Sequence, residues 1–267
     1  MRELIEVLRR SERIVVFSGA GISTDSGIPD YRGSGGQYSA YQPVYYQEFL
    51  SSSRKRREYW QHKASVWPAM RAADPTAGHR LVVRLHERGC LSGVITQNVD
   101  GLHEKSGIPR EMIVNLHGTN LEVECIGCGR RIPAGDVLDG LADVLNDCPL
   151  EAGGMDANRA LRMPAEEEVP LCRSCGNFLK PATVMFGQNL RSSDLERAET
   201  MLRDCDLLLA VGSTLMVQPA ASIPVLAKRN GAFLVILTLG GTPLDGEADL
   251  RIDDAITPVA EAVLNVL

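Results

Sequence analysis

Seven cysteines are present, and four of them form two Cys-x-x-Cys pairs: Cys125, Cys128, Cys172 and Cys175. Two such pairs supply four thiolates, which is the ligand set of a tetrahedral structural zinc ion. One pair alone would fit a redox disulfide, but two pairs favour zinc. Because cysteine fills all four positions, we expect a structural ion and not a catalytic one. The remaining thiols are predicted to have no role: Cys90, Cys148 and Cys205.

A glycine-containing turn follows the apolar run at residues 14–17. Gly19 and Gly21 have no Cβ, so the backbone can turn sharply there and approach a ligand closely. Ser23 and Thr24 offer hydroxyls or a helix N-cap, and the N–H groups of such a turn favour phosphate oxygens. Taken alone, the glycines fit an ordinary strand-to-helix turn as well as they fit a nucleotide site.

The usual dinucleotide-binding fingerprint requires a third glycine and an acidic residue about 20 positions further on. Thr24 stands at the place of the third glycine, and no acid occurs near the second place before Glu48. A generic Rossmann dehydrogenase is therefore disfavoured. Directly after the turn, residues 27–32 place a rigid proline, a carboxylate, an aromatic ring and a guanidinium beside the possible phosphate site.

Polar side chains also follow two further predicted strands. Asn98 and Asp100 come after one strand, and His117 comes after the next. Ligands of open parallel sheets bind at the carboxyl ends of strands, so Asn98 and Asp100 should face the same crevice as Gly19. Taken alone, Asn98 and Asp100 fit helix caps and His117 fits a structural histidine. The glycine beside His117 gives access, and an unperturbed pKa near neutrality suits a general base.

The elements that would position these residues alternate along the chain. Hydrophobic periodicity predicts strands at 14–17, 91–96, 112–116, 206–211 and 233–237, and helices at 2–10, 78–88, 193–204 and 256–267. The long loop and helix at 34–77 are predicted to form a lid, with Trp60 and Trp67 packing it onto the main body. The basic run at 54–57 is expected to be a solvated face. The gap between the cysteine pairs predicts a helical insertion at 136–168.

Bulk properties exclude several classes of protein. The chain has 267 residues, which allows one large domain with a smaller one attached. A net charge of −6 and a pI near 5.5 argue against a nucleic-acid-binding surface. No apolar run is long enough to span a membrane, and the first residues are predicted to be an amphipathic helix and not a signal peptide. The cysteine pairs suggest a reducing compartment, so we expect a cytoplasmic protein.

The stretch at 18–33, SGAGISTDSGIPDYRG, closely resembles the NAD-binding signature of the sirtuins, the NAD-dependent protein deacylases. The strings TQNVDGLH at 96–103 and LKPATVMFG at 179–187 and the His-Gly pair at 117–118 resemble further segments of that family. The resemblance implies an α/β fold, a Rossmann-like parallel sheet domain with a smaller zinc-ribbon and helical domain inserted. The implied large domain comprises 1–33, 78–118 and 179–267, with the lid at 34–77 and the zinc domain at 119–178.

By the same resemblance, the protein is a protein lysine deacylase of the deacetylase type, which transfers the acyl group to ADP-ribose and releases nicotinamide. His117 is the implied catalytic base, and Asn98 and Asp100 orient the ribose and a water. The implied NAD contacts are Gly19, Ala20, Gly21, Ser23, Thr24, Ile28, Asp30, Tyr31, Arg32, Gln97, Asn98, His117, Gly212, Ser213, Thr214 and Thr238. The implied substrate contacts are Val184, Met185, Phe186, Gly187, Gln188 and Val217.

The chain departs from the family pattern at several positions. Ser213 and Thr214 exchange the order of two hydroxyl residues, which keeps both hydroxyls. Thr238 stands where the family usually has an asparagine that holds the adenine ribose, and Gln188 replaces a glutamate. The long insertion and the lid tryptophans look most like class II sirtuins, which include weak deacetylases, deacylases of longer chains and ADP-ribosyltransferases.

Two alternatives stay open at this point. One is NAD-dependent ADP-ribosyl transfer to a protein, which would use the same NAD site. The other is a catalytically weak NAD-binding sensor, against which the joint presence of His117, Asn98 and Asp100 argues because binding alone needs no base. The expected partner is an acyl-lysine peptide or protein, with no nucleic acid and no membrane, and we expect a monomer.

Overall fold

The structure is a computed structural model that describes residues 1–30, 42–145 and 161–267. Tyr31, Arg32 and Cys148 lie outside the described residues, as do residues 34–41 of the predicted lid and residues 146–160 of the predicted helical insertion. The chain divides into two compact units. The first comprises Met1–Gly36, Asp74–His117 and Leu190–Leu267, and the second comprises Gln37–Ala73 and Gly118–Asn189.

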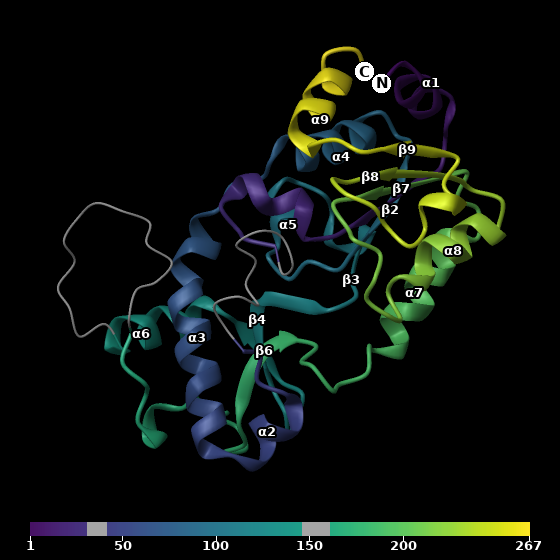
Figure 1. The fold of residues 1–267 in the computed structure, drawn as a ribbon. Helices are drawn as coiled ribbons and strands as arrows, with labels where there is room; N and C mark the ends of the chain where they lie inside the picture. The colour runs from purple at the N-terminus through teal and green to yellow at the C-terminus, as the bar shows by residue number, and fades with distance from the viewer. Residues whose placement is uncertain (31–41, 146–160) are drawn as a thin grey trace. The chain divides into compact units, whose positions relative to one another are not determined.

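The first unit is built on a six-stranded parallel sheet with the order β3-β2-β1-β7-β8-β9 (Figure 1). Its strands are β1 (Ile14–Ser18), β2 (Leu91–Thr96), β3 (Ile113–Asn115), β7 (Leu207–Val211), β8 (Phe233–Leu237) and β9 (Leu250–Ile252). From β1 the chain adds β2 and β3 on one side, and later β7, β8 and β9 on the other. The strand order therefore reverses between β1 and β7, which is where open α/β sheets bind ligands.

Helices cover both faces of this sheet, as its strands require. Ile14 and Val16 belong to one buried cluster with α1 (Arg2–Arg10), α4 (Ala77–Glu87) and α9 (Ile256–Leu264). Val15 and Phe17 belong to another with α7 (Ser192–Leu202) and α8 (Ser222–Arg229). Since successive side chains of a strand point to opposite faces, a fully apolar strand must be covered twice. The predicted Rossmann-like sheet is confirmed.

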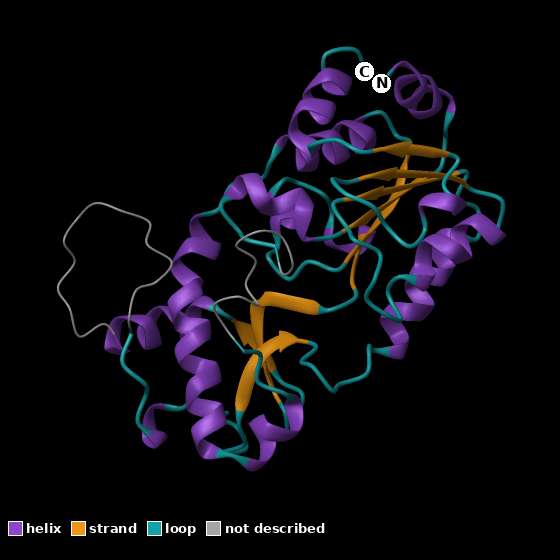
Figure 2. Cartoon of the chain, viewed as in Figure 1, coloured by secondary structure: helices purple, strands orange, loops and turns teal. Residues whose placement is uncertain are grey.

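The second unit contains a three-stranded antiparallel sheet with the order β5-β4-β6 (Figure 2). Its strands are β4 (Gly118–Cys125), β5 (Arg131–Pro133) and β6 (Leu179–Thr183), and its helices are α2 (Tyr46–Ser51), α3 (Ser53–Ala72) and α6 (Gly135–Leu145). The core includes Phe49, Trp60, Trp67, Val123 and Leu138, so α3 and the cysteine-bearing segment share one apolar cluster.

Short elements complete the described chain. They are α5 (Leu102–Lys105) and the 3₁₀ helices η1 (Ala20–Ser26), η3 (Arg110–Met112), η4 (Glu166–Glu168) and η5 (Asp245–Glu247). No helix among the described residues is long and apolar enough to cross a membrane.

Several expectations differ from the observed arrangement. The implied large domain resumes at residue 179, but residues 179–183 form β6, which pairs with β4 and lies in the second unit. Trp60 and Trp67 pack in the apolar core of the second unit, together with the cysteine-bearing segment. The basic run is not wholly solvated, because Arg56 is 8% exposed and its guanidinium lies 4.0 Å from the centroid of the Phe178 ring.

Candidate functional site

Three glycines bring two loops of the first unit into close contact. Gly19 and Gly21 follow β1, and Gly212 follows β7. The N–H of Gly19 donates to Val211 O at 3.0 Å, and the N–H of Gly21 donates to Gly212 O at 2.8 Å. A Cβ on Gly21 would lie 2.8 Å from Gly212 Cα, and a Cβ on Gly212 would lie 2.4 Å from Ile22 N. Only glycine permits this approach, and Gly212 also has a φ of +65°.

The glycines therefore do something other than what the sequence suggested. Gly19 and Gly21 were expected to leave room for a ligand, with N–H groups free for phosphate. In the structure their N–H groups serve the β7 loop, and their missing Cβ atoms admit backbone from that loop. Gly19, Gly21 and Gly212 thus form a rigid edge without side chains, at the point where the strand order reverses.

Asn98, Asp100 and Ser23 form a buried hydrogen-bonded group beside this edge. Asn98 Nδ2 donates to Gly19 O at 3.2 Å and to Ser23 Oγ at 3.1 Å. Ser23 Oγ donates to Asp100 Oδ2 at 2.8 Å, and the N–H of Leu102 donates to Asp100 Oδ1 at 2.9 Å. The structure thus brings together residues from the turn after β1 and from the turn after β2.

The carboxyl of Asp100 is subject to two opposing effects. Burial raises the pKa of Asp100, because a charged carboxylate loses its water. The two donors, Leu102 N–H and the Ser23 hydroxyl, act in the other direction and favour the carboxylate.

His117 lies directly after β3 and is oriented by a backbone carbonyl. Its Nδ1 is 2.9 Å from Gln97 O. A carbonyl only accepts, so Nδ1 carries the proton and Nε2 keeps its lone pair. Burial lowers the pKa of His117, and the hydrogen bond to Gln97 opposes that change. The ring is therefore neutral at physiological pH, with Nε2 able to accept a proton.

Gln97 connects this histidine to the loop after β7. Its side-chain nitrogen donates to Ser213 Oγ at 2.7 Å. Thr238 lies at the end of β8 and is 8% exposed. Thr24 is exposed, and its hydroxyl donates to Gly21 O at 3.1 Å, so it closes the turn. The other predicted NAD contacts are half-buried or exposed in the loops after β1 and β7: Ala20, Ile28, Asp30 and Thr214.

The predicted substrate residues are divided between the units. Val217 belongs to the first unit, and the other five follow β6 in the second: Val184, Met185, Phe186, Gly187 and Gln188. Gly187 has a φ of +84°, which glycine adopts without strain. Gln188 Oε1 accepts from the N–H of Met185 at 2.9 Å. A glutamate offers the same acceptor oxygen, so the exchange at this position keeps the turn.

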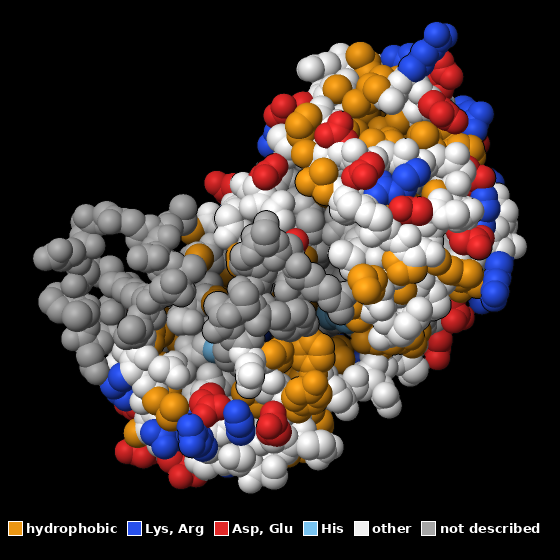
Figure 3. Space-filling view, in the orientation of Figure 1, with side chains coloured by type: hydrophobic (Ala, Val, Ile, Leu, Met, Phe, Trp, Pro, Cys, Tyr) orange, Lys and Arg blue, Asp and Glu red, His pale blue; other side chains and the backbone are white. Residues whose placement is uncertain are grey.

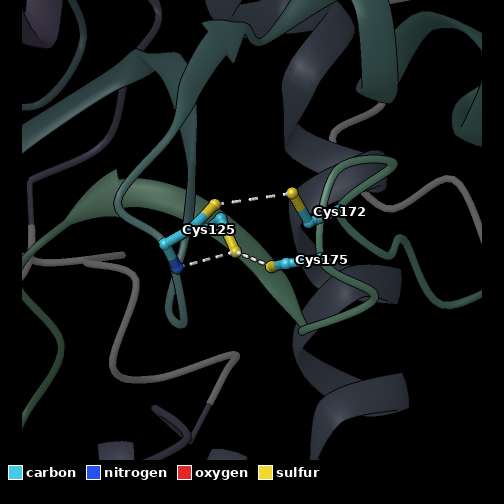
Figure 4. A group of neighbouring side chains, drawn as sticks. Cys125, Cys172 and Cys175 are labelled. Carbon is cyan, nitrogen blue, oxygen red and sulfur yellow. Dashed lines mark hydrogen bonds between the residues drawn. The ribbon is translucent and has the colours of Figure 1, made fainter.

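The four cysteines of the second unit come together. Their sulfur atoms all lie within 4.8 Å of one another. Cys125 Sγ is 3.4 Å from Cys175 Sγ, and Cys128 Sγ is 3.8 Å from Cys172 Sγ. Zn–S bonds of about 2.3 Å in a tetrahedron separate sulfurs by about 3.8 Å, so the cluster fits one zinc ion. Figure 4 shows Cys125, Cys172 and Cys175 pointing toward one another.

Backbone N–H groups around the cluster favour thiolates. Those of Gly127 and Cys128 donate to Cys125 Sγ, each at 3.4 Å. Those of Ser174 and Cys175 lower the pKa of Cys172 to about 6. Thiolates bind zinc, and all four ligands come from the protein, so the protein has one structural zinc ion.

Sequence reasoning missed four buried polar residues of the first unit: Ser18, Thr96, His79 and His103. Thr96 and His103 stood inside the string compared with a family signature, but nothing local marked them as partners. The only available signal was their position at the ends of predicted elements. Their hydrogen bonds join segments far apart in the sequence.

Comparisons with known proteins agree with this site. Residues 19–219 match the model of the Sir2 family. The chain is 37% identical over 252 residues to the NAD-dependent protein deacetylase of Rhodopseudomonas palustris, covering 94% of this chain and 91% of that protein. It is 38% identical over 258 residues to NAD-dependent protein deacetylase 2 of Streptomyces coelicolor, covering 95% and 97%. A solved structure of Sir2 with a p53 peptide and NAD+ is 33% identical, with a TM-score of 0.80 over 99% of this chain and 97% of that one.

Proposed function

This chain belongs to the Sir2 family, and from that premise we propose that it is an NAD-dependent protein lysine deacylase of the deacetylase type. It transfers the acyl group of acyl-lysine to ADP-ribose and releases nicotinamide. The observation that carries the proposal is the orientation of His117, whose Nδ1 is committed to Gln97 O and whose Nε2 is left as the base. A protein that only bound NAD would need no such base.

The loop edge of the first unit suits the pyrophosphate of NAD. Gly19, Gly21 and Gly212 leave no side chain there, and Ser23 and Ser213 supply hydroxyls beside them. Such an edge suits a dinucleotide, because hydroxyl groups lie beside a rigid backbone at the strand-order reversal. When bound, NAD supplies the ribose carbon that accepts the acyl oxygen as nicotinamide leaves. Ile28 and Asp30 are proposed to hold the nicotinamide amide.

His117 acts on the ribose. Its neutral imidazole takes a proton from a ribose hydroxyl through Nε2 and stays oriented through Nδ1. Asn98 and Asp100 orient the ribose and a water, and Ser23 holds both of them in place. Removal of the proton lets the ribose oxygen bond to the acyl carbon, and lysine leaves as the free amine. The oriented water supplies the acyl carbonyl oxygen, because the original one stays on the ribose carbon.

We assign the acyl-lysine peptide to the segment after β6 and to Val217. Phe186 is 45% exposed, so part of its ring is available for contact with an apolar acyl-lysine chain. Gly187, Gln188 and Val217 are proposed to bind the peptide backbone by strand addition. The identity of the acyl group is to be determined by experiment, because the resemblance to class II sirtuins does not specify it.

We further propose that the protein acts as a monomer in the cytoplasm and binds no nucleic acid or membrane. Among the described side chains that Figure 3 shows, acidic and basic groups are interspersed and form no broad basic patch. None of the six cysteines of the described chain is in a disulfide, as expected of a reducing compartment. The net charge of −6 also argues against nucleic-acid binding.

The test is mass spectrometry of products formed from NAD and a panel of acetyl-, long-chain acyl-, lipoyl- and succinyl-lysine peptides, with unmodified peptide as control. We expect O-acyl-ADP-ribose with at least one acyl peptide, and the best substrate names the acyl group. Nicotinamide release with ADP-ribose attached to protein, and no O-acyl product on any peptide, would overturn deacylation in favour of ADP-ribosyl transfer. If no nicotinamide were released with any peptide, the alternative of a catalytically weak NAD-binding sensor would be favoured.

A further inference from the structure

We propose that His103 is a positioning residue for deacylation, which holds the Asn98 loop in place through Ser18 and Thr96. The inference rests on the proposed function, because it assigns the loop that carries Asn98 and Asp100 to catalysis. It concerns a histidine that does not belong to the proposed NAD or substrate contacts. His103 lies in α5, directly after that loop, and is 1% exposed.

A continuous series of hydrogen bonds leads from His103 to Asn98. His103 Nε2 is 2.8 Å from Ser18 Oγ, at the end of β1. Ser18 Oγ donates to Thr96 Oγ1, at the end of β2, over 2.8 Å. Thr96 Oγ1 in turn accepts from the backbone N–H of Asn98 at 3.0 Å. The imidazole thereby ties the ends of both strands to the backbone of the loop between β2 and α5.

The series also fixes the proton position on His103. A serine hydroxyl has one proton, and Ser18 uses it toward Thr96. Ser18 must therefore accept from His103, so the proton of His103 is on Nε2 and Nδ1 has only a lone pair. His103 Nδ1 is buried and has no hydrogen-bond partner among the described residues.

His79 in α4 packs edge to face against His103. Its Nδ1 accepts from the backbone N–H of Thr76 at 3.1 Å and lies 3.0 Å from the Thr76 hydroxyl oxygen. Because a backbone N–H only donates, the proton of His79 is assigned to Nε2. His79 Nε2 is also buried without a hydrogen-bond partner in the described chain. The centroids of the two rings are 4.8 Å apart at an interplanar angle of 62°. The tautomer of His103 therefore rests on its hydrogen bond with Ser18, and His79 contributes the ring against which His103 packs.

Burial supports this arrangement. It lowers the pKa of His79 to about 4 and that of His103 well below the usual range, so both rings stay neutral. A neutral His103 has a single N–H, which Ser18 receives. The opposite end of the series is Asn98, whose side chain bonds Ser23, which bonds Asp100. Moving the backbone of Asn98 would displace both proposed ribose-orienting residues.

The test compares three variants of the full-length zinc-loaded protein. His103→Phe keeps a flat ring but removes both nitrogens, whereas His103→Gln keeps an N–H donor near the position of Nε2. Leu85→Ala is the matched control, because Leu85 is fully buried in the same unit and its side chain takes no part in the hydrogen bonds described. The readouts are kcat and the KM values for NAD and for the best acyl peptide, together with Tm and zinc content.

We expect His103→Phe to lower kcat by about 10-fold or more, as expected for a lost buried hydrogen bond, with a smaller change in the peptide KM. His103→Gln should recover most of that loss. Leu85→Ala should lower Tm at least as much but leave kcat within about 2-fold, since cavity formation acts on stability. A His103→Phe variant with wild-type kcat, or a Leu85→Ala variant with an equal loss of kcat, would overturn the proposal.

A second measurement separates this proposal from the proposed function. Long-range ¹H–¹⁵N NMR spectra of the histidine rings report which nitrogen carries the proton, whatever the activity. We expect the proton of His103 on Nε2. A proton on Nδ1 would overturn the positioning role even in an active enzyme. An Nε2 proton in a wild-type protein that deacylates no peptide would overturn the proposed function and leave the hydrogen-bonded series standing.

Discussion

Two regions of the molecule hold distant segments of the chain together, but by different forces. One is the group of loops after β1, β2 and β7, and the other is the four-cysteine cluster. In the first unit, Gly21 and Gly212 meet backbone to backbone, and Ser23, Asn98 and Asp100 satisfy one another's hydrogen bonds. In the second unit, the sulfur atoms of four cysteines from residues 125–128 and 172–175 lie within 4.8 Å of one another, as the ligands of one zinc ion would. One region depends on shape and polar pairing, and the other depends on metal coordination.

This difference separates stability from chemistry. All cluster ligands are cysteines, so the metal has no open position and contributes folding energy only. The polar region, by contrast, buries a carboxylate and an imidazole, which is costly and unnecessary for folding alone. We therefore expect changes at the cluster to unfold the second unit, and changes at the polar region to alter activity in a protein that still folds.

The largest effect should follow removal of a zinc ligand. Cys172→Ser leaves three thiolates, and structural zinc contributes on the order of 10 kcal/mol in small domains. We expect loss of zinc and proteolytic sensitivity in the second unit, measured by metal analysis and limited proteolysis. Cys205→Ser is the control, because Cys205 is a buried thiol of the first unit and should leave the zinc content unchanged. A zinc-loaded Cys172→Ser protein would contradict the account.

Gly21→Ala should disrupt the close packing of the loops after β1 and β7, because the added methyl group would clash with backbone. The new Cβ would lie 2.8 Å from Gly212 Cα, which is backbone that cannot easily move. We expect a loss of about 1–3 kcal/mol in the free energy of unfolding, with weakened NAD binding, measured by denaturant unfolding and calorimetric titration.

Gly140→Ala in α6 is the matched control for that change, since a Cβ there would meet nothing within 4 Å. It should stabilise the protein by about 0.5–1 kcal/mol, because alanine is the better helix former. Equal effects of the two substitutions would mean that close backbone approach does not hold the NAD loop.

The pH dependence of activity should sharpen the comparison. Burial lowers the pKa of His117, and the base acts in its deprotonated form. Activity should therefore be retained as the pH falls to 6.5. It should be lost only when the pH falls further, through the lowered pKa of His117. The profile of kcat/KM, which reports the free enzyme, should show its acidic limb below pH 6.5. A limb above that pH would contradict a buried neutral base, provided that the zinc content is constant across the range.

The smallest effect concerns Thr238. The family usually has an asparagine there, and Thr238 is nearly buried at the end of β8. Thr238→Asn offers both a donor and an acceptor, and one added hydrogen bond changes affinity by about two- to ten-fold. We expect the KM for NAD to fall by that factor with kcat unchanged. A higher KM would show that the threonine hydroxyl is itself the better contact here.

The parallel sheet and the cysteine cluster could be predicted from sequence because their signals are local. Apolar runs mark β1, β2, β7 and β8, and each Cys-x-x-Cys pair is visible on its own. The fit of Gly21 against Gly212 could not be predicted, because nearly two hundred positions separate the two residues and only the register of β1 against β7 brings them together. The same holds for Ser18, Thr96 and His103.

Errors at the domain boundary have a similar cause. Residues 179–183, LKPAT, contain a lysine and a proline and show no clear strand pattern, and only their pairing with β4 places them in the second unit. The tryptophans Trp60 and Trp67 were expected to fasten a lid, since sequence shows that they must be buried but not against what. Pairing and packing partners are properties of the folded chain.

The most direct test of the whole account separates the two steps of the reaction in His117→Ala. Exchange of labelled nicotinamide into NAD in the presence of the best acyl peptide reports the first step, and formation of free lysine reports the second. Because His117 is assigned to the ribose proton, we predict that exchange persists while lysine formation falls by about 10²- to 10⁴-fold, the usual range for a general base. If lysine formation persists at the wild-type rate in this variant, His117 is not the base and the central claim fails.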